Sequence, residues 1–275
     1  MIGIIQGRLS QPINNKIQAF PWSSWEEEFS IAAEIGFDDI EFIFETENYL
    51  QNPLWTTGGL KRIKELTKET GVMLNHICAD YFMENPFVRV SREQKENNLQ
   101  VLKKLMEQAM NLGVKSIELP MVDNSRIENE AEKNQVVEIL QTAVPLMEKY
   151  NLGLSIESSL PPQELKDLLE RLAHPLFSIT YDTGNSSSLG YDTEEEILAF
   201  GKWISNVHIK DRVLHGTTVA LGTGDADLSK SFEIFKQIGY SGPFTLQAAR
   251  AEDPVENSRN QYQYLQNLIS QYLKK

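Results

Sequence analysis

Cysteine, histidine and basic residues are all scarce in this sequence. Cys78 is the single cysteine among 275 residues, which excludes an internal disulfide, and histidine occurs four times. Acidic residues outnumber basic ones by 39 to 26, and the formal net charge is −13. Such a charge would repel a phosphate backbone, so nucleic acid is not an expected partner.

Long apolar runs are also missing. None approaches the roughly 20 residues that a membrane helix needs, and residues 1–8 hold no apolar signal-peptide core of useful length. We therefore expect a cytoplasmic protein with no membrane partner. The hydrophobic content of 41% and charged content of 24% are ordinary for a folded globular chain.

Three signatures of nucleotide or hydrolase sites are absent. The chain has no Gly-x-x-x-x-Gly-Lys-Ser/Thr phosphate loop and no Gly-x-Ser-x-Gly elbow. The segment 222–227 does not qualify as a dinucleotide loop, because Asp227 stands where the third glycine would be. Nothing in the sequence argues for a reactive thiolate at Cys78, which we interpret as a packing residue.

A glycine that can end a helix recurs along the chain, at Gly36, Gly71, Gly113, Gly153 and Gly239. An amphipathic stretch precedes each glycine and a short apolar or alternating run follows it. The pattern predicts eight strands, near 2–6, 38–43, 72–77, 114–119, 153–157, 177–182, 204–209 and 243–247. It predicts eight helices, near 24–35, 58–70, 92–112, 126–149, 161–171, 193–201, 228–238 and 254–273.

Eight alternating units without a Gly/Ser/Pro-rich linker favour an α/β fold of one closed (β/α)8 TIM barrel. Such barrels are typically about 250 residues long, so residues 1–275 are predicted to form a single domain. A Rossmann-like pair of halves is the alternative.

Polar and apolar residues alternate within the predicted strands. In the fifth strand, Leu154 and Ile156 lie opposite Ser155 and Glu157. Helices must cover the apolar face, so the polar face is predicted to point into the barrel. Its last inward residues, at the carboxyl ends where such barrels keep their sites, are Glu41, Glu157, Asp182, His208 and Gln247.

Glu157, Asp182 and His208 end three successive predicted strands. Two carboxylates and an imidazole are a common ligand set for manganese, zinc, iron or cobalt. Each residue alone could equally cap a strand or pair with a neighbour, but three in one layer favour a metal site. Gln247 would be a fourth group there, with an amide oxygen that can ligate but cannot take up a proton.

Lys210 and Arg212 follow His208 directly and, together with Arg8, are candidates for binding an anionic or hydroxyl-rich substrate. Surface salt bridges are the alternative for all three. His76, near the end of the third predicted strand, is interpreted as a substrate contact in preference to a structural histidine.

Several short motifs, taken in order, resemble those of the xylose-isomerase-like barrel family, and most of all its sugar-phosphate isomerases and epimerases. The motifs are Gln6-Gly7-Arg8-Leu9-Ser10, Ile156-Glu157, Asp182-Thr183-Gly184-Asn185, Val207-His208-Ile209-Lys210-Asp211 and Leu221-Gly222-Thr223-Gly224-Asp225.

In the epimerases of that family, Glu, Asp, His and Glu hold a divalent metal, and the two glutamates form the acid/base pair. The resemblance implies a metal site at Glu157, Asp182, His208 and Gln247, with Glu157 catalytic and Mn, Zn, Mg or Co as the ion. Gln247 departs from the pattern, and Asn185 replaces a usual histidine. We expect substrate contacts from Gln6, Arg8, Glu41, His76, Asn185, Lys210 and Arg212.

The amide of Gln247 removes one negative charge from the ligand set, which should weaken the binding of a hard cation. Epimerisation by deprotonation usually needs two proton-transfer groups, whereas aldose–ketose isomerisation through a cis-enediol needs one base. We therefore predict a metal-dependent isomerase of a small sugar or sugar phosphate. The alternatives are a sugar epimerase of the same family and a catalytically silent sugar-binding barrel.

A related class, the apurinic endonuclease, is disfavoured by the four histidines and the charge of −13. The sequence leaves open whether the chain forms a homo-oligomer.

Overall fold

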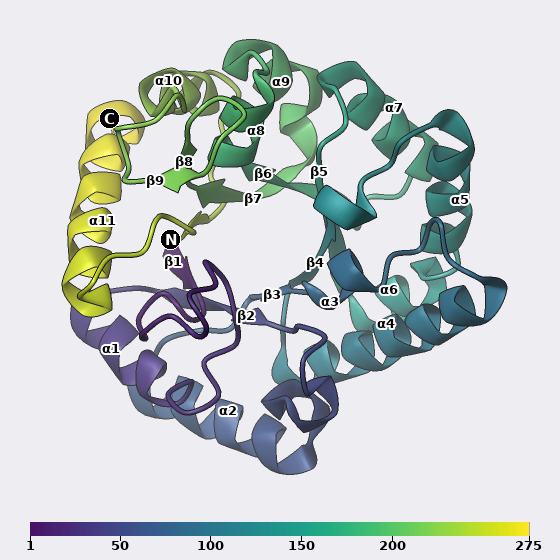
Figure 1. Cartoon of the computed structure of the whole chain (residues 1–275), viewed down its shortest axis with the longest axis horizontal. Coiled ribbons are helices and arrows are strands. Elements are labelled where there is room, and N and C mark those ends of the chain that lie inside the picture. Colours follow the sequence, from purple (N-terminus) through teal and green to yellow (C-terminus); the bar gives the residue numbers. More distant parts are fainter. Residues whose placement is uncertain (275) are drawn as a thin grey trace.

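The eight predicted strands close into one parallel barrel. In the computed structural model, which describes residues 1–274, the strands pair in the order β1-β10-β7-β6-β5-β4-β3-β2 and back to β1 (Figure 1). Closure confirms the predicted TIM barrel and excludes an open Rossmann-like sheet. The strands are β1 (Ile2–Ile5), β2 (Asp39–Ile43), β3 (His76–Cys78), β4 (Ser116–Met121), β5 (Gly153–Ser158), β6 (Phe177–Asp182), β7 (Ile204–Ile209) and β10 (Phe244–Leu246).

Helices form the outer ring of the barrel (Figure 1). The helices are α1 (Glu27–Ile35), α2 (Thr57–Thr70), α3 (Tyr81–Glu84), α4 (Arg92–Leu112), α5 (Glu130–Gln141), α6 (Val144–Tyr150), α7 (Pro162–Leu172), α8 (Thr183–Leu189), α9 (Thr193–Phe200), α10 (Leu228–Gln237) and α11 (Pro254–Leu268). The short helices α3 and α8 lie inside the ring (Figure 1). None of the helices within residues 1–274 is long and apolar enough to cross a membrane.

Local sequence explains where the longest helix, α4, begins and ends. Ser91 accepts a hydrogen bond from the Gln94 backbone, and the Gln94 side chain bonds back to the Ser91 backbone. This reciprocal cap satisfies two N–H groups at the helix start. At the other end Gly113 adopts the left-handed conformation that stops the helix, as predicted. Between them Val101, Leu102 and Leu105 lie on the buried face.

Two predicted elements differ from the structure. The helix expected over 126–149 is divided into α5 and α6, because Pro145 cannot supply the backbone N–H that a continuous helix would need. Helix α6 also ends at left-handed Asn151 and not at Gly153. The third strand is shorter than the predicted 72–77, because Asn75 bonds to the Asp39 side chain through its backbone N–H and its amide.

The barrel strands bury apolar side chains on one face and polar side chains on the other. Ile40, Ile117 and Leu154 belong to the apolar core, and burying each such side chain stabilises the fold by roughly 1.5–3 kcal/mol. Inward polar groups instead bond to one another across the barrel. Near its amino end, His76 Nδ1 lies 3.3 Å from Asp39 Oδ2.

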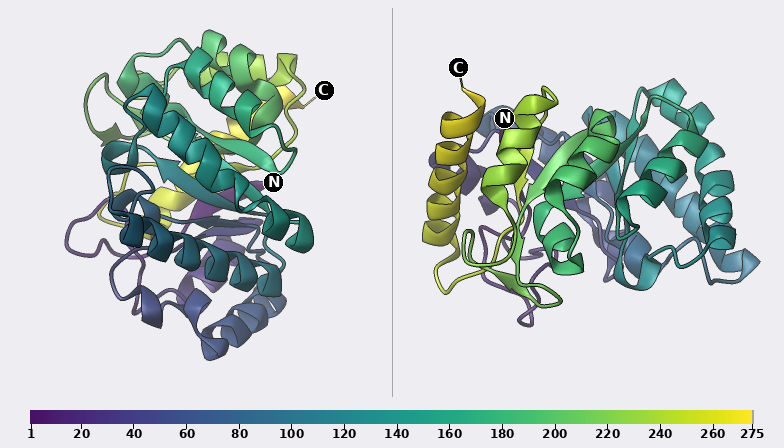
Figure 2. Two further views of the ribbon diagram at one scale, coloured as in Figure 1. Left: turned by 90° about the vertical axis from the view of Figure 1, so that its right-hand side faces the viewer. Right: turned by 90° about the horizontal axis from the view of Figure 1, so that it is seen from above.

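The remaining elements are mostly short turns. An antiparallel hairpin, β8 (Asp211–Arg212) and β9 (Thr218–Val219), follows β7. Both chain termini lie at one end of the barrel, and this hairpin lies at the other (Figure 2). The 3-10 turns are η1 (Tyr49–Gln51), η2 (Pro53–Trp55), η3 (Asp123–Ser125) and η4 (Gly201–Trp203), and a π-helical turn, Ile269–Leu273, extends α11.

Candidate active site

A cavity of about 380 Å³ opens at the carboxyl ends of the strands. Its volume is in the range of small-molecule sites. We call it the mouth cavity. Five of the residues predicted for the site line it: Glu157, Asn185, Lys210, Arg212 and Gln247.

Glu157 is the last inward residue of β5 and is buried. Burial, together with the nearby charge of Asp182, raises the pKa of Glu157 to about 7. The Asn185 amide donates a hydrogen bond to Glu157 Oε1 and holds the carboxyl in place. A carboxyl with this pKa can give up and take back a proton near neutral pH, which suits general acid/base catalysis.

Asp182 ends β6 and caps the short helix α8. Its Oδ1 accepts hydrogen bonds from the backbone N–H groups of Gly184, at 2.8 Å, and Asn185, at 2.7 Å. Glycine at position 184 allows close approach of the next strand, because an added Cβ would lie 2.7 Å from Lys210 Cγ. The cap therefore fixes Asn185 beside Glu157 and leaves Asp182 Oδ2 facing Lys210.

Lys210 carries its ammonium group into the mouth of the barrel. Its Nζ lies 3.3 Å from Asp182 Oδ2 and 3.0 Å from Gln247 Oε1. The Lys210 side chain is 13% exposed and that of Asp182 is 1% exposed, so solvent screens this pair weakly. A fixed positive charge thus bridges two of the four residues that the resemblance assigned to the metal.

His208 lies deeper in the barrel, between two glutamates. Its Nε2 is 3.0 Å from Glu41 Oε2 and 3.3 Å from Glu118 Oε2, and all three side chains are at most 1% exposed. We call these three residues the inner cluster. Burial alone would lower the pKa of His208, but the two carboxylates raise it to about 10.

The two glutamates of the inner cluster differ in the direction of their pKa shifts. Burial would raise the pKa of Glu41, but the adjacent His208 outweighs it and lowers the pKa. Burial raises the pKa of Glu118 well above its usual range. These directions favour an ionised Glu41 beside a protonated His208.

Two donor sets for a metal ion share His208. One ligand atom from each member of the inner cluster lies within 4.8 Å of the other two, so this group could hold a metal. The set predicted from the sequence combines His208 with Glu157 and Asp182, but within residues 1–274 these three are not a group whose ligand atoms lie this close together. Within residues 1–274, His208 Nδ1 is buried without a hydrogen-bond partner, and a metal ion bound there would have to displace the proton of the imidazolium.

Four residues predicted to contact substrate do not line the mouth cavity: Glu41, which belongs to the inner cluster, and Gln6, Arg8 and His76. Gln6 Oε1 accepts a hydrogen bond from the Ile43 backbone, and His76 pairs with Asp39. Arg8 is buried and donates to the carbonyl oxygens of Ala248, at 3.0 Å, and Ile17, at 2.6 Å. Arg8 therefore links the loop after β1 to the loop after β10.

Arg212 lines the mouth cavity and is held by its own loop. Its Nε and Nη2 donate to the Gly216 carbonyl, at 3.1 and 2.7 Å. Its Nη1 donates to Asn185 Oδ1 at 2.8 Å. Arg212 therefore fixes the orientation of the Asn185 amide, which in turn holds Glu157.

Comparison with known proteins identifies the family. The family model described as "Xylose isomerase-like TIM barrel" matches residues 29–268. The chain belongs to this family. A curated member, L-ribulose-5-phosphate 3-epimerase UlaE of Escherichia coli (strain K12), is 26% identical over 242 residues, covering 84% of this chain and 85% of the relative.

Solved structures share the xylose isomerase-like barrel fold. A xylose isomerase domain protein from Planctomyces limnophilus superposes with a TM-score of 0.78 at 15% identity, covering 98% of both chains. The IolI protein with a bound zinc atom gives a TM-score of 0.79 at 19% identity, covering 100% of this chain and 99% of that one. The curated relatives are sugar epimerases by name and bear out the prediction of an enzyme of the isomerase and epimerase class.

Three polar residues of this xylose isomerase-like barrel were missed from the sequence. Glu118 completes the inner cluster, and the alternation of Ser116 and Glu118 with apolar neighbours in the fourth strand could have revealed it. Asp80 and Gln18 line the mouth cavity and bond to each other at 2.6 Å. Both lie in loops, where strand alternation gives no signal.

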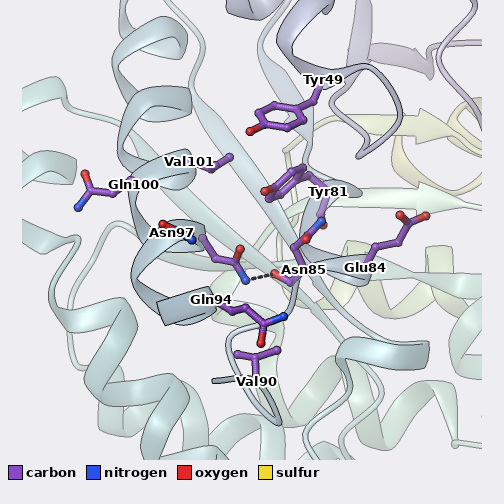
Figure 3. Close-up of a pocket in the computed structure, with 10 residues that line it drawn as sticks. Tyr49, Tyr81, Glu84, Asn85, Val90, Gln94, Asn97, Gln100 and Val101 are labelled. Atoms are coloured by element: carbon purple, nitrogen blue, oxygen red, sulfur yellow. Dashed lines mark hydrogen bonds between the residues drawn. The ribbon is translucent and has the colours of Figure 1, made fainter. Parts of the chain in front are cut away.

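A second cavity, of about 430 Å³, lies between α4 and the loops after β2 and β3. Figure 3 shows the rings of Tyr49 and Tyr81 beside the amide side chains of α4. None of the residues predicted for the site lines it, so the mouth cavity is the candidate active site.

Proposed function

We propose that this chain is a sugar isomerase or epimerase that moves a proton next to a carbonyl group. The observation that carries the proposal is Glu157, a buried carboxyl with a pKa of about 7 that faces the mouth cavity. The names of the curated family members support the same chemistry.

Glu157 would act as the base. Its carboxylate removes the proton from the carbon beside the carbonyl, and the electron pair moves toward the carbonyl oxygen to give an enediol. Return of the proton to the neighbouring carbon interconverts an aldose and a ketose, and return to the opposite face of the same carbon gives an epimer. Asn185 holds the base, and Lys210 supplies positive charge near the developing oxyanion.

Gln247 favours the isomerase, because a neutral amide cannot exchange a proton on the second face. The epimerase is the second candidate, favoured by the names of the relatives and by Asp80. Asp80 lines the mouth cavity, and burial raises its pKa. It therefore supports an epimerase better than His76 or Glu41, which bond to Asp39 and His208 respectively.

A divalent metal would be held by Glu157, Asp182 and His208, with Gln247 as a weak fourth ligand. Such an ion would polarise the sugar carbonyl and lower the barrier to proton removal. The unpartnered Nδ1 of His208 fits this role, and the Glu41 contact at Nε2 would orient the ring, as carboxylates commonly do for ligating histidines. The ammonium of Lys210, next to Asp182 and Gln247, would weaken the ion's binding by repulsion.

The test is deuterium exchange in heavy water with a panel of ketoses, followed by mass spectrometry and chiral analysis of the products. The proposal predicts deuterium at the carbon next to the carbonyl with the parent protein and none with Glu157→Gln. Asp80→Asn separates the two candidates. Deuterium exchange should persist in either case, but an epimerase should lose inversion at the exchanged carbon, whereas an isomerase should be unaffected. Absence of exchange with every sugar, in metal-loaded protein, would instead favour the silent sugar-binding barrel.

A further inference from the structure

We infer that the substrate of the mouth cavity is an unphosphorylated sugar. The inference rests on the proposed function and narrows its substrate class. It separates this chain from the relatives named for a phosphorylated pentulose. A sugar phosphate carries close to two negative charges, and proteins bind such groups with free Arg or Lys side chains or with unpaired backbone N–H groups. The two cationic side chains that line this cavity, and two sets of N–H groups near it, are already engaged.

The first engaged cation is Lys210. Its ammonium lies between Asp182 Oδ2, at 3.3 Å, and Gln247 Oε1, at 3.0 Å. When no metal ion is bound to Asp182, drawing the ammonium toward a phosphate would leave the Asp182 carboxylate, which is 1% exposed, without its positive partner. Removing one partner of a buried ion pair is strongly unfavourable.

Arg212 is the second cation, and among the described residues these two are the basic side chains that line the cavity. Three nitrogens of its guanidinium already donate, two to the Gly216 carbonyl and one to Asn185. The forked, two-oxygen grip that arginine gives a phosphate needs two adjacent donors. Forming it here would release both the hairpin loop and the amide that holds Glu157.

Backbone N–H groups near the mouth are engaged in the same way. The glycine-containing loop after β9 turns the N–H groups of Gly222, Gly224 and Ala226 toward one point, a geometry that binds anions. The Asp211 carboxylate already fills that point, at 2.9, 2.9 and 3.1 Å. At the start of α8, the two N–H groups that could receive an anion donate to Asp182 Oδ1.

The rest of the cavity wall suits a neutral polyol. Gln18 and Gln247 present amides, and Thr217 and Thr218 present hydroxyl groups. Asp80 and Asp123 add carboxyl groups, which accept hydrogen bonds from sugar hydroxyls but repel a phosphate. The side chain of Met83 provides apolar surface for the carbon face of a sugar.

The experiment compares matched pairs of substrates with the metal-loaded full-length protein: D-ribulose with D-ribulose 5-phosphate, L-ribulose with L-ribulose 5-phosphate, and D-fructose with D-fructose 6-phosphate. Deuterium incorporation from heavy water gives kcat/KM for each. For the best pair we expect the free sugar to exceed its phosphate by at least about tenfold, the factor given by roughly 1.4 kcal/mol. An equal or higher kcat/KM for the phosphate overturns the inference but leaves the proposed function intact. Incorporation into neither member of any pair counts against the proposed function itself.

A charge-removing variant tests the physical cause. Asp123 lines the cavity, so Asp123→Asn should lower KM for the phosphorylated member of the pair by about threefold to fivefold through reduced repulsion. Glu107→Gln is the matched control. Glu107 is exposed on α4, so its substitution makes the same change in net charge at a position that does not line the cavity. Equal KM values for the phosphate in the two variants would contradict the electrostatic explanation.

Discussion

The inner cluster and the mouth cavity are built from similar side chains but differ in their access to solvent. In the inner cluster, Glu41, Glu118 and His208 are sealed from solvent, and His208 Nε2 contacts both carboxyl groups. At the mouth, Glu157 and Lys210 face a cavity of about 380 Å³. In both regions burial raises the pKa of a glutamate, Glu118 in the inner cluster and Glu157 at the mouth. Only in the mouth cavity can the shifted group meet a substrate, so a perturbed pKa indicates chemistry only where a path to solvent exists.

His208 connects the two regions. Its Nε2 belongs to the inner cluster, and its Nδ1 is the atom without a partner in the described part of the chain. The inner cluster therefore fixes the orientation of the imidazole, and a metal ion at the mouth would bind its Nδ1. The following predictions separate these two roles.

The largest expected effect is that of His208→Ala, which acts on both regions. Metal binding should be abolished, and loss of the imidazole leaves Glu41 as an uncompensated buried charge, which costs about 3–5 kcal/mol of folding free energy. Elemental analysis and urea unfolding measure the two effects. His174→Ala, at an exposed ion pair with Glu148, is the control and should change neither. Metal content equal to that of the parent would show that the ligand assignment is wrong.

Glu157→Gln acts at the mouth alone. Removing the base should lower kcat by about 10²- to 10⁴-fold, with little change in unfolding free energy because the amide keeps an oxygen for Asn185. Glu157 must be ionised to act as a base and its pKa is about 7, so kcat/KM of the parent should rise as pH passes through about 7. A pH profile that is flat between 6 and 8, roughly one unit either side of that pKa, would exclude Glu157 as the base.

Asp182→Asn and Glu118→Gln decide which donor set holds a metal. If the mouth set holds the ion, Asp182→Asn should weaken binding roughly 100-fold. Glu118 does not belong to that set, and Glu118→Gln is nearly isosteric, so it should change affinity by less than about threefold. Isothermal titration with Mn²⁺ and Zn²⁺ gives both constants. The reverse ranking would assign the ion to the inner cluster.

Gln247→Glu and Lys210→Met should each tighten metal binding by about tenfold, the first by adding an anionic ligand and the second by removing a competing cation. Gln247→Glu should also supply a second proton-transfer group and confer some epimerase activity on a matched sugar. Solvent-deuterium incorporation with stereochemical analysis measures it. Efficient epimerisation by the parent would contradict the one-base mechanism and point to Asp80.

The smallest effect is expected from limited proteolysis. The single-domain prediction implies that a nick in the loop 213–217 leaves one cooperative unit, because β1 and β10 pair across the barrel closure. Size-exclusion chromatography of the nicked protein should give one peak. Two separately folded halves would favour a two-domain chain.

Much of the barrel was predictable because its strands follow strict chemical alternation. Glu157, Asp182 and His208 were assigned to inward strand ends. Glu157 lines the mouth cavity and Asp182 lies near it, whereas His208 lies in the inner cluster. The number and order of strands followed from the recurring α-then-β units. Pro145, visible in the sequence, explains the one helix that was predicted as continuous and is divided.

The partners of the charged side chains could not be predicted. Lys210 was expected to contact a substrate, but its ammonium is bound by Asp182 and Gln247, residues 28 and 37 positions away. Arg8 donates a hydrogen bond across 240 residues, to the carbonyl oxygen of Ala248. Long flexible side chains select partners from everything that the closed barrel brings within reach, and strand periodicity contains no information on that choice.

The anchoring of the hairpin loop to Asp211 has a consequence for how this wall of the cavity can vary among related sequences. One carboxylate orders three backbone N–H groups, and an added Cβ at Gly224 would lie 2.3 Å from Asp211 Oδ1. A side chain larger than hydrogen at position 224 would therefore require a change at position 211. The side chains between the two positions, Thr217 and Thr218 among them, do not take part in this anchor. The residues of this loop that face the cavity can therefore vary while Asp211 and Gly224 keep the loop in place.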